Sequence, residues 1–326
     1  MSKIIISTIT FNCLKYTKLC LKYIKSTCSY PHEILVVDNG SIDGTVEWLK
    51  TQDVTLIENG KNLGYAYAHN NIYDYAWKDD PETLLILLSN DMLPLPHAID
   101  DLIEAAEASD VPIISGETLS TPVYCSMYPE DRRFFAGGDR ITVDSEGYGN
   151  WSNGRMYSLI EETADEFVAS ASSKLLPTLP PTTLIETGSF SPPGHRVYRK
   201  SYFDAIGYFD ANFYPIYSVD FDYTMRASLT GQNVHVVQSS LCLEFWSRCI
   251  YEGSVVLRDV RRDDYYREKW GPHAAYTVGW SIPFNGSFPA HHAGYDTSQV
   301  RISSREGELE RVTQLMGYAQ RRIIGR

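Results

Sequence analysis

The sequence predicts an α/β protein with a mostly parallel central sheet covered by helices on both faces. In the first 115 residues, short apolar runs alternate with segments whose apolar residues recur at helical spacing. The apolar runs are continuous, as in Leu84 to Leu88, which is typical of strands buried on both faces. The chain has 326 residues, 43% of them hydrophobic, enough for one large domain of this kind plus an appendage.

Each expected element rests on its own local pattern. The expected strands are apolar runs bounded by turn residues, and they cover Lys3 to Ile9, Glu33 to Val37, Val54 to Ile57, Thr83 to Leu88 and Pro112 to Ser115. The expected helices have apolar residues three and four positions apart, and they cover Leu14 to Ser26, Gly44 to Lys50, Gly64 to Trp77 and Ala98 to Ala108. Ligands of such sheets bind at the carboxyl ends of the strands, so we expect the functional site there.

The regular pattern stops after residue 116 and returns near residue 194. Pro, Gly, Ser and Tyr are frequent between these points, and we expect inserted strands and loops over 116–193. Beyond the insertion, the pattern predicts helices near Lys200 to Ile206 and Val219 to Thr230 and a strand at Val234 to Val237. We therefore expect one domain over 1–248, containing the insertion, and a C-terminal extension over 249–326.

Composition narrows the classes of function. The chain has 29 basic and 41 acidic residues, a net charge of −12, so it has no general attraction to nucleic acid or anionic lipid. Arg258, Arg261 and Arg262 are a candidate local basic patch. The six cysteines lack the spacing of a zinc site. We see no leader peptide and no run of about 20 apolar residues, so we expect a cytoplasmic protein whose membrane contact, if any, is peripheral.

Two polar turns follow expected strands. The first, Asp38 to Ser41, places a carboxylate where it could accept hydrogen bonds from a nucleobase or ribose hydroxyl, although the segment also fits a plain turn with Asp43 capping the next helix. The second, Asn62 to Gly64, opens a helix. A glycine there lets a phosphate-bearing ligand approach the backbone, and an ordinary helix start is the alternative.

Ser89-Asn90-Asp91 directly follows the wholly apolar run that ends at Leu88. A carboxylate at the end of a buried strand is unfavourable unless it meets a cation or faces solvent. Mg²⁺ and Mn²⁺ bind few protein carboxylates and complete their coordination with water and substrate phosphate. The segment therefore predicts a metal site at Asp91, with a polar turn before Pro94 as the alternative.

Asp220 and Asp222 lie near the start of an expected helix. Two carboxylates at i and i+2 do not face the same way. One can face a cleft and act as general base towards an acceptor hydroxyl, while the other caps the helix or pairs with a cation. Charge complementarity at a helix N-terminus is the alternative.

The order of these motifs resembles family two of the glycosyltransferases, inverting enzymes with the GT-A fold, and especially its rhamnosyltransferase-like members. The run from Val36 to Thr45 is very close to the family signature "VDNGSTDGT". The individually weaker matches are Thr10 to Asn12 for "TYN", Asn62 to Gly64 for "NLG", Ser89 to Asp91 for the acidic metal motif and Val219 to Tyr223 for "EDVDL". The resemblance covers roughly Lys3 to Ser115 and Gly194 to Val237.

The resemblance implies sugar transfer by one in-line displacement at the anomeric carbon. Asp220 would take the proton of the acceptor hydroxyl, and Asp91 would hold Mn²⁺ or Mg²⁺ and thereby the diphosphate. The residues expected to contact the donor are Thr8, Thr10, Asn12, Asp38, Asn39, Asn62, Gly64, Asn70 and Asn90. The donor would be a UDP-, dTDP- or GDP-linked sugar and the acceptor a glycan or lipid-linked glycan, with the insertion on the acceptor side.

The sequence departs from the family pattern in ways that affect the site. Asp91 is the one acid left in the metal motif. Val219 replaces the Glu that usually precedes the base, which leaves open whether Asp220 or Asp222 faces the cleft. Glu244 stands where many relatives carry a metal-binding His, and a carboxylate suits either ion. Other candidates for that role are His273, His291 and His292.

Three other functions compete with this one. A nucleotidyltransferase would usually have a Gly-rich basic loop after the first strand, and the segment Thr10 to Leu14 is not one. A catalytically silent nucleotide-sugar or glycan-binding scaffold is suggested by the departures at Ser89 and Val219. A transferase that modifies a base in DNA is disfavoured by the net charge of −12.

Overall fold

The computed structural model describes residues 2–136, 158–188, 195–213, 219–220, 222–223 and 234–245. The expected extension over 249–326, and with it the arginine patch and His273, His291 and His292, lies outside these residues. So does most of the helix expected over Val219 to Thr230. None of the described helices is long and apolar enough to cross a membrane.

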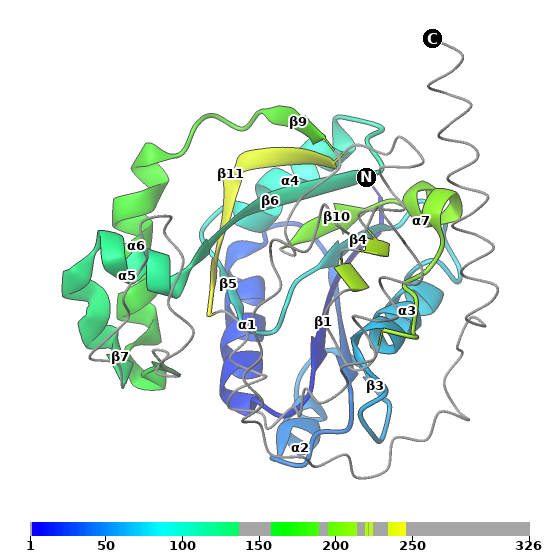
Figure 1. Cartoon of the computed structure of the whole chain (residues 1–326), viewed down its shortest axis with the longest axis horizontal. Helices are drawn as coiled ribbons and strands as arrows, with labels where there is room; N and C mark the ends of the chain where they lie inside the picture. The colour runs from blue at the N-terminus through cyan, green and yellow to red at the C-terminus, as the bar shows by residue number, and fades with distance from the viewer. Residues whose placement is uncertain are drawn as a thin grey trace, which may run out of the picture.

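A mixed sheet forms the centre of the molecule (Figure 1). Its strand order is β3-β2-β1-β4-β10-β6-β11-β5, and β9 also pairs with β11. The strands are β1 (Ile4–Thr10), β2 (Glu33–Asp38), β3 (Thr55–Glu58), β4 (Leu84–Leu87), β5 (Met92–Pro94), β6 (Ile113–Ser120), β9 (Leu184–Gly188), β10 (Arg196–Tyr198) and β11 (Val234–Glu244). β1 to β4 pair in parallel, as does β6 with β11, whereas β5, β9 and β10 run antiparallel to their neighbours.

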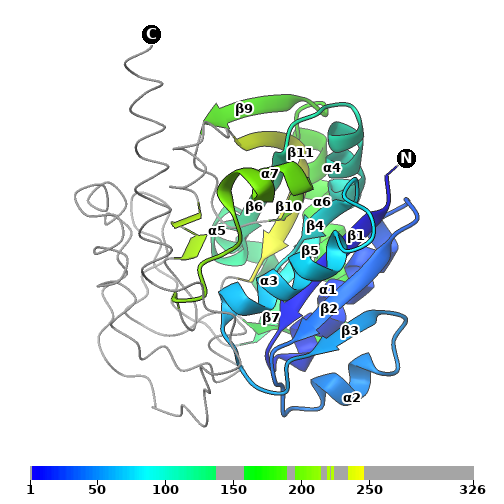
Figure 2. The same ribbon diagram turned by 90° about the vertical axis from the view of Figure 1, so that its right-hand side faces the viewer.

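Helices cover both faces of this sheet (Figures 1 and 2). Alternate residues of β1 point to opposite faces. Ile4 and Ile6 join the core under α1 (Leu14–Thr27) and α4 (Ala98–Glu107). Ile5 joins the core under α3 (Tyr65–Ala76) and α7 (Lys200–Ile206). α2 (Thr45–Leu49) follows β2 near the edge of the sheet formed by β3. The expected α/β class is thus confirmed.

The region expected to hold inserted strands and loops contains more helix than the sequence indicated. Between β6 and β9, the described residues include α5 (Thr121–Met127), a 3-10 helix (Pro129–Phe134), the strand pair β7 (Phe135–Ala136) and β8 (Ser158–Leu159), and α6 (Ala164–Leu175). Their side chains form a third core with α1, β5 and the end of β11. Phe167, Ala171 and Leu175 of α6 recur at helical spacing and are buried in it. The Ala and Ser residues between them make this period hard to recognise in the sequence.

Two short strands were not anticipated. β5 and β10 have three residues each, too few to show a period of two. β11 runs well past the expected Val234 to Val237, with a register irregularity between Val237 and Leu241. The extra length of β11 matters because it carries the chain to Glu244, at the carboxyl edge of β4.

Candidate functional site

The candidate site lies at the carboxyl edge of β1, β2 and β4. β1 and β2 end in register, with Thr10 opposite Asp38. Asn90 and Asp91 follow β4, the other neighbour of β1. Because parallel strands share their carboxyl edge, the sheet gathers three motifs that are far apart in the sequence.

Asp38 closes the turn after β2 with one of its carboxylate oxygens. Its Oδ1 accepts hydrogen bonds from the backbone N–H groups of Gly40 and Ser41, both at 2.9 Å. Its Oδ2 is buried and has no hydrogen-bond partner among the described residues. Buried polar atoms are nearly always paired in folded proteins, so this oxygen is a ready acceptor for a hydroxyl or N–H group of a ligand.

Asn39 ties this turn to the start of α3. Its Nδ2 donates to Asn62 Oδ1 at 2.9 Å, and its Oδ1 accepts from the backbone N–H of Leu63 at 3.0 Å. Asn62 Oδ1 also accepts from the N–H of Gly64 at 2.9 Å, and Gly64 adopts a φ of 87° at the N-cap of α3. Because Asn39 and Asn62 hydrogen-bond to each other and to the backbone, they fix the turn after β2 against the segment that leads into α3.

A buried network connects β1, α1 and the loop after β4. Asn90 Nδ2 donates to Thr10 Oγ1 at 3.3 Å and to Thr17 Oγ1 at 3.1 Å, and the two hydroxyls are 2.8 Å apart. Thr17 belongs to α1. The network fixes the backbone immediately before Asp91.

The other residues expected at the donor have varied environments. Asn12, with a φ of 56°, accepts a hydrogen bond from the N–H of Ile42 at 2.9 Å and so holds the loop beyond Asp38. Asn70 exchanges two hydrogen bonds with the backbone of Phe209, at 2.9 and 3.0 Å, which fix the segment after α7. Thr8 is buried in β1, and its Oγ1 has no hydrogen-bond partner among the described residues.

Asp91 and Glu244 are brought together by the pairing of β5 with β11. Glu244 lies opposite Met92, and the N–H of Phe245 donates to the carbonyl of Asp91 at 2.9 Å. Burial, and then the charge of Asp91, raises the pKa of Glu244 to about 8. Two carboxylates that disfavour each other's charge in a partly buried place are a fitting pair of ligands for a divalent cation.

The described residues hold no group of three or more His, Cys, Asp or Glu side chains placed to bind a metal. Two carboxylates nevertheless match the requirement of Mg²⁺ or Mn²⁺ bound together with a diphosphate, because water and phosphate oxygens complete the coordination. Asp91 and Glu244 are the candidate pair.

Asp220 and Asp222 differ in their surroundings. Asp222 is fully buried, whereas Asp220 is partly exposed, and the flanking Val219 is buried in the core under α3. Burial raises the pKa of Asp220, and the charge of Arg196 opposes that rise. Asp220 is therefore the better placed of the two to meet a substrate.

Sequence reasoning missed two residues of this site, Arg196 and Tyr65. Burial raises the pKa of the Tyr65 hydroxyl, and so do the charges of Asp220 and Asp91, so Tyr65 lies within electrostatic reach of both acids. The signal for Tyr65 was its place directly after Gly64, at the start of α3. Arg196 had no such signal, because its strand has only three residues.

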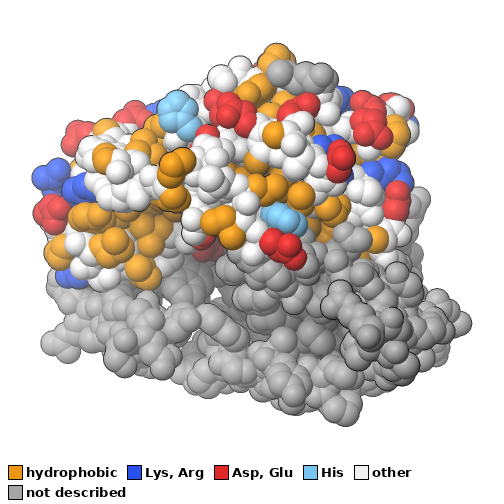
Figure 3. Space-filling model, turned by 90° about the horizontal axis from the view of Figure 1, so that it is seen from above, with side chains coloured by type: hydrophobic (Ala, Val, Ile, Leu, Met, Phe, Trp, Pro, Cys, Tyr) orange, Lys and Arg blue, Asp and Glu red, His pale blue; other side chains and the backbone are white. Residues whose placement is uncertain are grey.

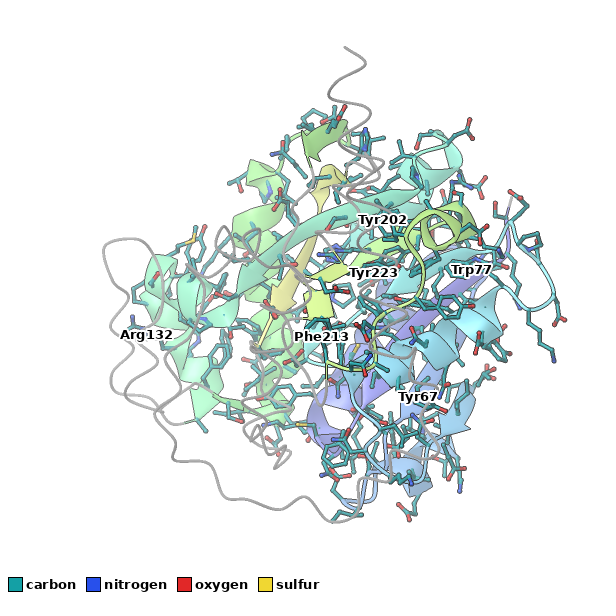
Figure 4. The ribbon with its side chains drawn as sticks, turned by 45° about the vertical axis from the view of Figure 1, so that its right-hand side comes forward. Tyr67, Trp77, Arg132, Tyr202, Phe213 and Tyr223 are labelled. Carbon is teal, nitrogen blue, oxygen red and sulfur yellow. The ribbon has the colours of Figure 1, made fainter. Side chains whose placement is uncertain are left out.

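A rich aromatic core supports this side of the site. Tyr202 and Tyr223 pack edge to face with ring centroids 5.7 Å apart, and both belong to the core shared by α3 and α7 (Figure 4). Tyr65 and His69 of α3 extend the same cluster towards the sheet edge, with their ring centroids 4.2 Å apart. This packing holds the start of α3 and the segment around Asp220 in fixed relation.

The family of the chain follows from comparison with known proteins. A model described as glycosyl transferase family 2 matches residues 5–207, and the chain belongs to this family. The resemblance inferred from the sequence motifs is thereby confirmed. A search of curated proteins gave no match.

Solved structures show the same fold at low sequence identity. The chain is similar to residues 1–349 of TarS from S. aureus, with 13% identity, a TM-score of 0.51 and coverage of 98% of this chain and 87% of that one. It is also similar to GalNAc-T7, solved with UDP, GalNAc and Mn²⁺, with 13% identity, a TM-score of 0.53 and coverage of 85% and 50%. The fold is that of the GT-A glycosyltransferases.

Proposed function

We propose that the chain transfers a sugar from a nucleoside-diphosphate-sugar to an acceptor hydroxyl, with inversion and with the assistance of Mn²⁺ or Mg²⁺. The observation that carries the proposal is the pairing of β5 with β11. It sets Glu244 beside Asp91 at the same sheet edge where Asp38 presents an unpaired buried oxygen. Along this edge, Asp38 would bind the nucleoside end of one donor molecule, and Asp91 and Glu244 would bind its diphosphate end through the cation.

Each residue would contribute a distinct interaction. Asp38 Oδ2 would accept a hydrogen bond from the ribose or base, and the glycine start of α3 would let the backbone approach the diphosphate. Asp91 and Glu244 would hold the cation. A bound divalent cation supplies charge stabilisation for the departing nucleoside diphosphate. GalNAc-T7, which shares the fold, was solved with UDP and Mn²⁺, which agrees with this assignment.

Asp220 would act as the general base. It is partly exposed, whereas Asp222 is fully buried, and its raised pKa brings it nearer to neutrality, where a base is most effective. The carboxylate would take the proton of the acceptor hydroxyl as that oxygen attacks the anomeric carbon, and the nucleoside diphosphate would leave from the opposite face. Such a base typically contributes about 10²–10⁴-fold to the rate.

The acceptor would be a glycan or lipid-linked glycan, in the cytoplasm or at a membrane surface. The net charge of −12 disfavours a nucleic acid acceptor. On the described part of the face in Figure 3, basic side chains stand in small groups among acidic and apolar ones. A gel shift with duplex DNA at low salt tests this point, and a shift would favour a DNA acceptor.

Two substitutions test the proposal. Asp91→Ala should abolish the metal-dependent part of donor binding, measured by calorimetry with UDP-, GDP- and dTDP-sugars in the presence and absence of Mn²⁺. Asp220→Asn should keep donor binding and lose transfer. Near-wild-type turnover of Asp220→Asn would move the base to Asp222. Binding without turnover in the wild-type protein, with many acceptors, would support a silent binding module instead.

A further inference from the structure

We propose that Thr17 of α1 is a positioning residue that couples the two ends of the donor site, the turn after β2 and the loop that carries Asp91. The inference rests on the proposed binding of a nucleoside diphosphate and a divalent cation at this edge of the sheet. It adds to the site a residue from a helix, outside every motif that the sequence suggested.

Thr17 lies at the centre of a set of buried hydrogen bonds. It is itself buried, as are Thr10 and Asn90. The hydroxyls of Thr10 and Thr17 are 2.8 Å apart. Asn90 Nδ2 donates to Oγ1 of Thr17 at 3.1 Å and to Oγ1 of Thr10 at 3.3 Å. Side chains from β1, from α1 and from the loop after β4 thus meet at one point.

The direction of each hydrogen bond follows from the number of hydrogens. The Thr10 hydroxyl has a single hydrogen and donates it to the carbonyl of Asn12 at 3.0 Å. The hydrogen between the two threonines therefore belongs to Thr17, which donates to Thr10 and accepts from Asn90. A side chain in this place must both donate and accept. Valine has nearly the same shape as threonine but can do neither.

From Thr10, the contacts lead to the turn after β2. Asn12 has a φ of 56°, a left-handed conformation that is uncommon for residues other than glycine. Its carbonyl accepts from Thr10, its N–H donates to Ser41 Oγ at 2.7 Å, and its Oδ1 accepts from the N–H of Ile42 at 2.9 Å. The N–H of Ser41 donates in turn to Asp38 Oδ1, and Oδ2 of that carboxylate is the proposed acceptor for the nucleoside.

Helix α1 also fixes the loop at the metal end of the site, at two points. Thr17 accepts from Asn90, whose backbone leads directly into Asp91. About one turn further along the helix, Cys20 Sγ donates to the carbonyl of Ser89 at 3.7 Å. The helix packs as well against β5, the strand that follows this loop. The loop that carries the proposed metal ligand is therefore positioned by α1.

A nucleoside diphosphate would bridge the two ends, so its affinity depends on how they are placed relative to each other. With the cation, the nucleoside would meet Asp38 while the diphosphate meets the ion at Asp91. Without the cation, binding would rest on the nucleoside end. Loss of the Thr17 hydroxyl should therefore reduce the gain in affinity that Mn²⁺ confers and leave metal-free binding nearly unchanged. These two measurements separate positioning from a general loss of structure.

The test is the Mn²⁺ gain, the ratio of the Kd values without and with MnCl₂, measured by calorimetry with UDP, GDP and dTDP. The nucleotide with the largest gain in the wild-type protein is used for all variants. We expect Thr17→Val to lower the gain by about 3- to 10-fold, the effect of one lost hydrogen bond, and to change the metal-free Kd by less than about 2-fold. Thr17→Ser keeps the hydroxyl and should keep most of the gain.

Thr83→Val is the matched control. Thr83 is also buried, directly before β4, and its Oγ1 has no hydrogen-bond partner among the described residues. The same substitution removes no hydrogen bond there, so the Mn²⁺ gain should equal that of the wild-type protein. An equal loss of the gain in Thr83→Val and Thr17→Val would overturn the inference.

Other outcomes separate this inference from the proposed function. A full Mn²⁺ gain in Thr17→Val, with the gain abolished in Asp91→Ala, would refute the role of Thr17 and leave the metal site in place. Equal weakening of Thr17→Val with and without Mn²⁺ would indicate a damaged fold and refute it too. The absence of any gain in the wild-type protein would refute the proposed metal site and this inference with it. Should Thr17→Val fail to fold, Thr17→Ala decides, since a full gain in that variant contradicts the coupling.

Discussion

Replacement of Gly40 by alanine should lower the unfolding free energy of the protein, because the turn that follows β2 has no room for a side chain at this position. Gly40 has a φ of +90°, and its N–H donates to Asp38. A Cβ placed there would lie 2.4 Å from Cα, 2.6 Å from C and 2.7 Å from N of Lys61. These are backbone atoms, so no side-chain rotation relieves the contact.

The magnitude follows from two separate costs. A left-handed conformation costs a non-glycine residue about 1–2 kcal/mol. Ordinary carbon contacts begin near 3.4 Å, so the Lys61 backbone must move by about 1 Å, and forced shifts of this kind cost about 1–3 kcal/mol. We expect Gly40→Ala to lose about 2–5 kcal/mol of unfolding free energy in total.

Gly60→Ala provides the control within the same protein. Gly60 also has a positive φ, of +69°, but a Cβ there would meet nothing within 4 Å. It should lose only the conformational part, about 1–2 kcal/mol. Urea unfolding followed by tryptophan fluorescence gives both values. Equal losses for the two variants would refute the close-approach argument. Because Lys61 precedes Asn62, Gly40→Ala should also weaken UDP, GDP or dTDP binding, and Gly60→Ala should not.

Two further predictions concern buried carboxylates. Asp38→Asn should weaken nucleoside diphosphate binding by about 1.5–3 kcal/mol, the value of a hydrogen bond to a charged acceptor, and calorimetry with UDP, GDP and dTDP measures it; undiminished affinity for all three would remove Asp38 from the donor site. Lys174→Met should cost about 1–3 kcal/mol of stability near neutral pH, because Lys174 Nζ donates to the buried Asp131 at 2.7 Å. Burial raises the pKa of Asp131. Hydrogen bonds to its carboxylate, of which the one from Lys174 is the strongest, outweigh that effect and lower the pKa below its ordinary value. The stabilisation is thus present above about pH 4 and lost in more acidic solution. The unfolding free energy of Lys174→Met, measured from pH 2 to 7, should fall less on acidification than that of the wild-type protein. An equal fall in the two proteins would contradict this.

The sequence predicted the parallel half of the fold because its strands are buried on both faces and read as unbroken apolar runs. The strands β1, β2 and β4 and the helices α1, α3 and α4 lie close to their expected ranges. The run from Val36 to Thr45, close to the family signature, and the order of the weaker motifs together led to the family, whereas Asp38 to Ser41 alone also fits an ordinary turn. Apolar runs, helical spacing and motifs all lie within short stretches of the chain, so they can be recognised from the sequence alone.

The antiparallel part of the sheet could not be read in the same way. β5 and β10 are held by pairing with strands far away in the chain, so three residues suffice in the structure and leave no periodic signal. Arg196 was missed for this reason. Glu244 was proposed as a metal ligand from spacing relative to the family, and the structure sets it beside Asp91 through the length of β11, which the sequence underestimated. Its role as a ligand stays a prediction.

Binding of Mn²⁺ together with a nucleoside diphosphate tests the central claim most directly. Calorimetric titrations of UDP, GDP and dTDP into the wild-type protein, Asp91→Asn and Glu244→Gln, each with and without MnCl₂, report the contribution of each carboxylate. The shared site predicts that Mn²⁺ tightens binding of at least one nucleotide in the wild-type protein and that each substitution removes most of this gain. A full Mn²⁺ gain in Glu244→Gln, or none in the wild-type protein, would contradict the site formed where β5 pairs with β11.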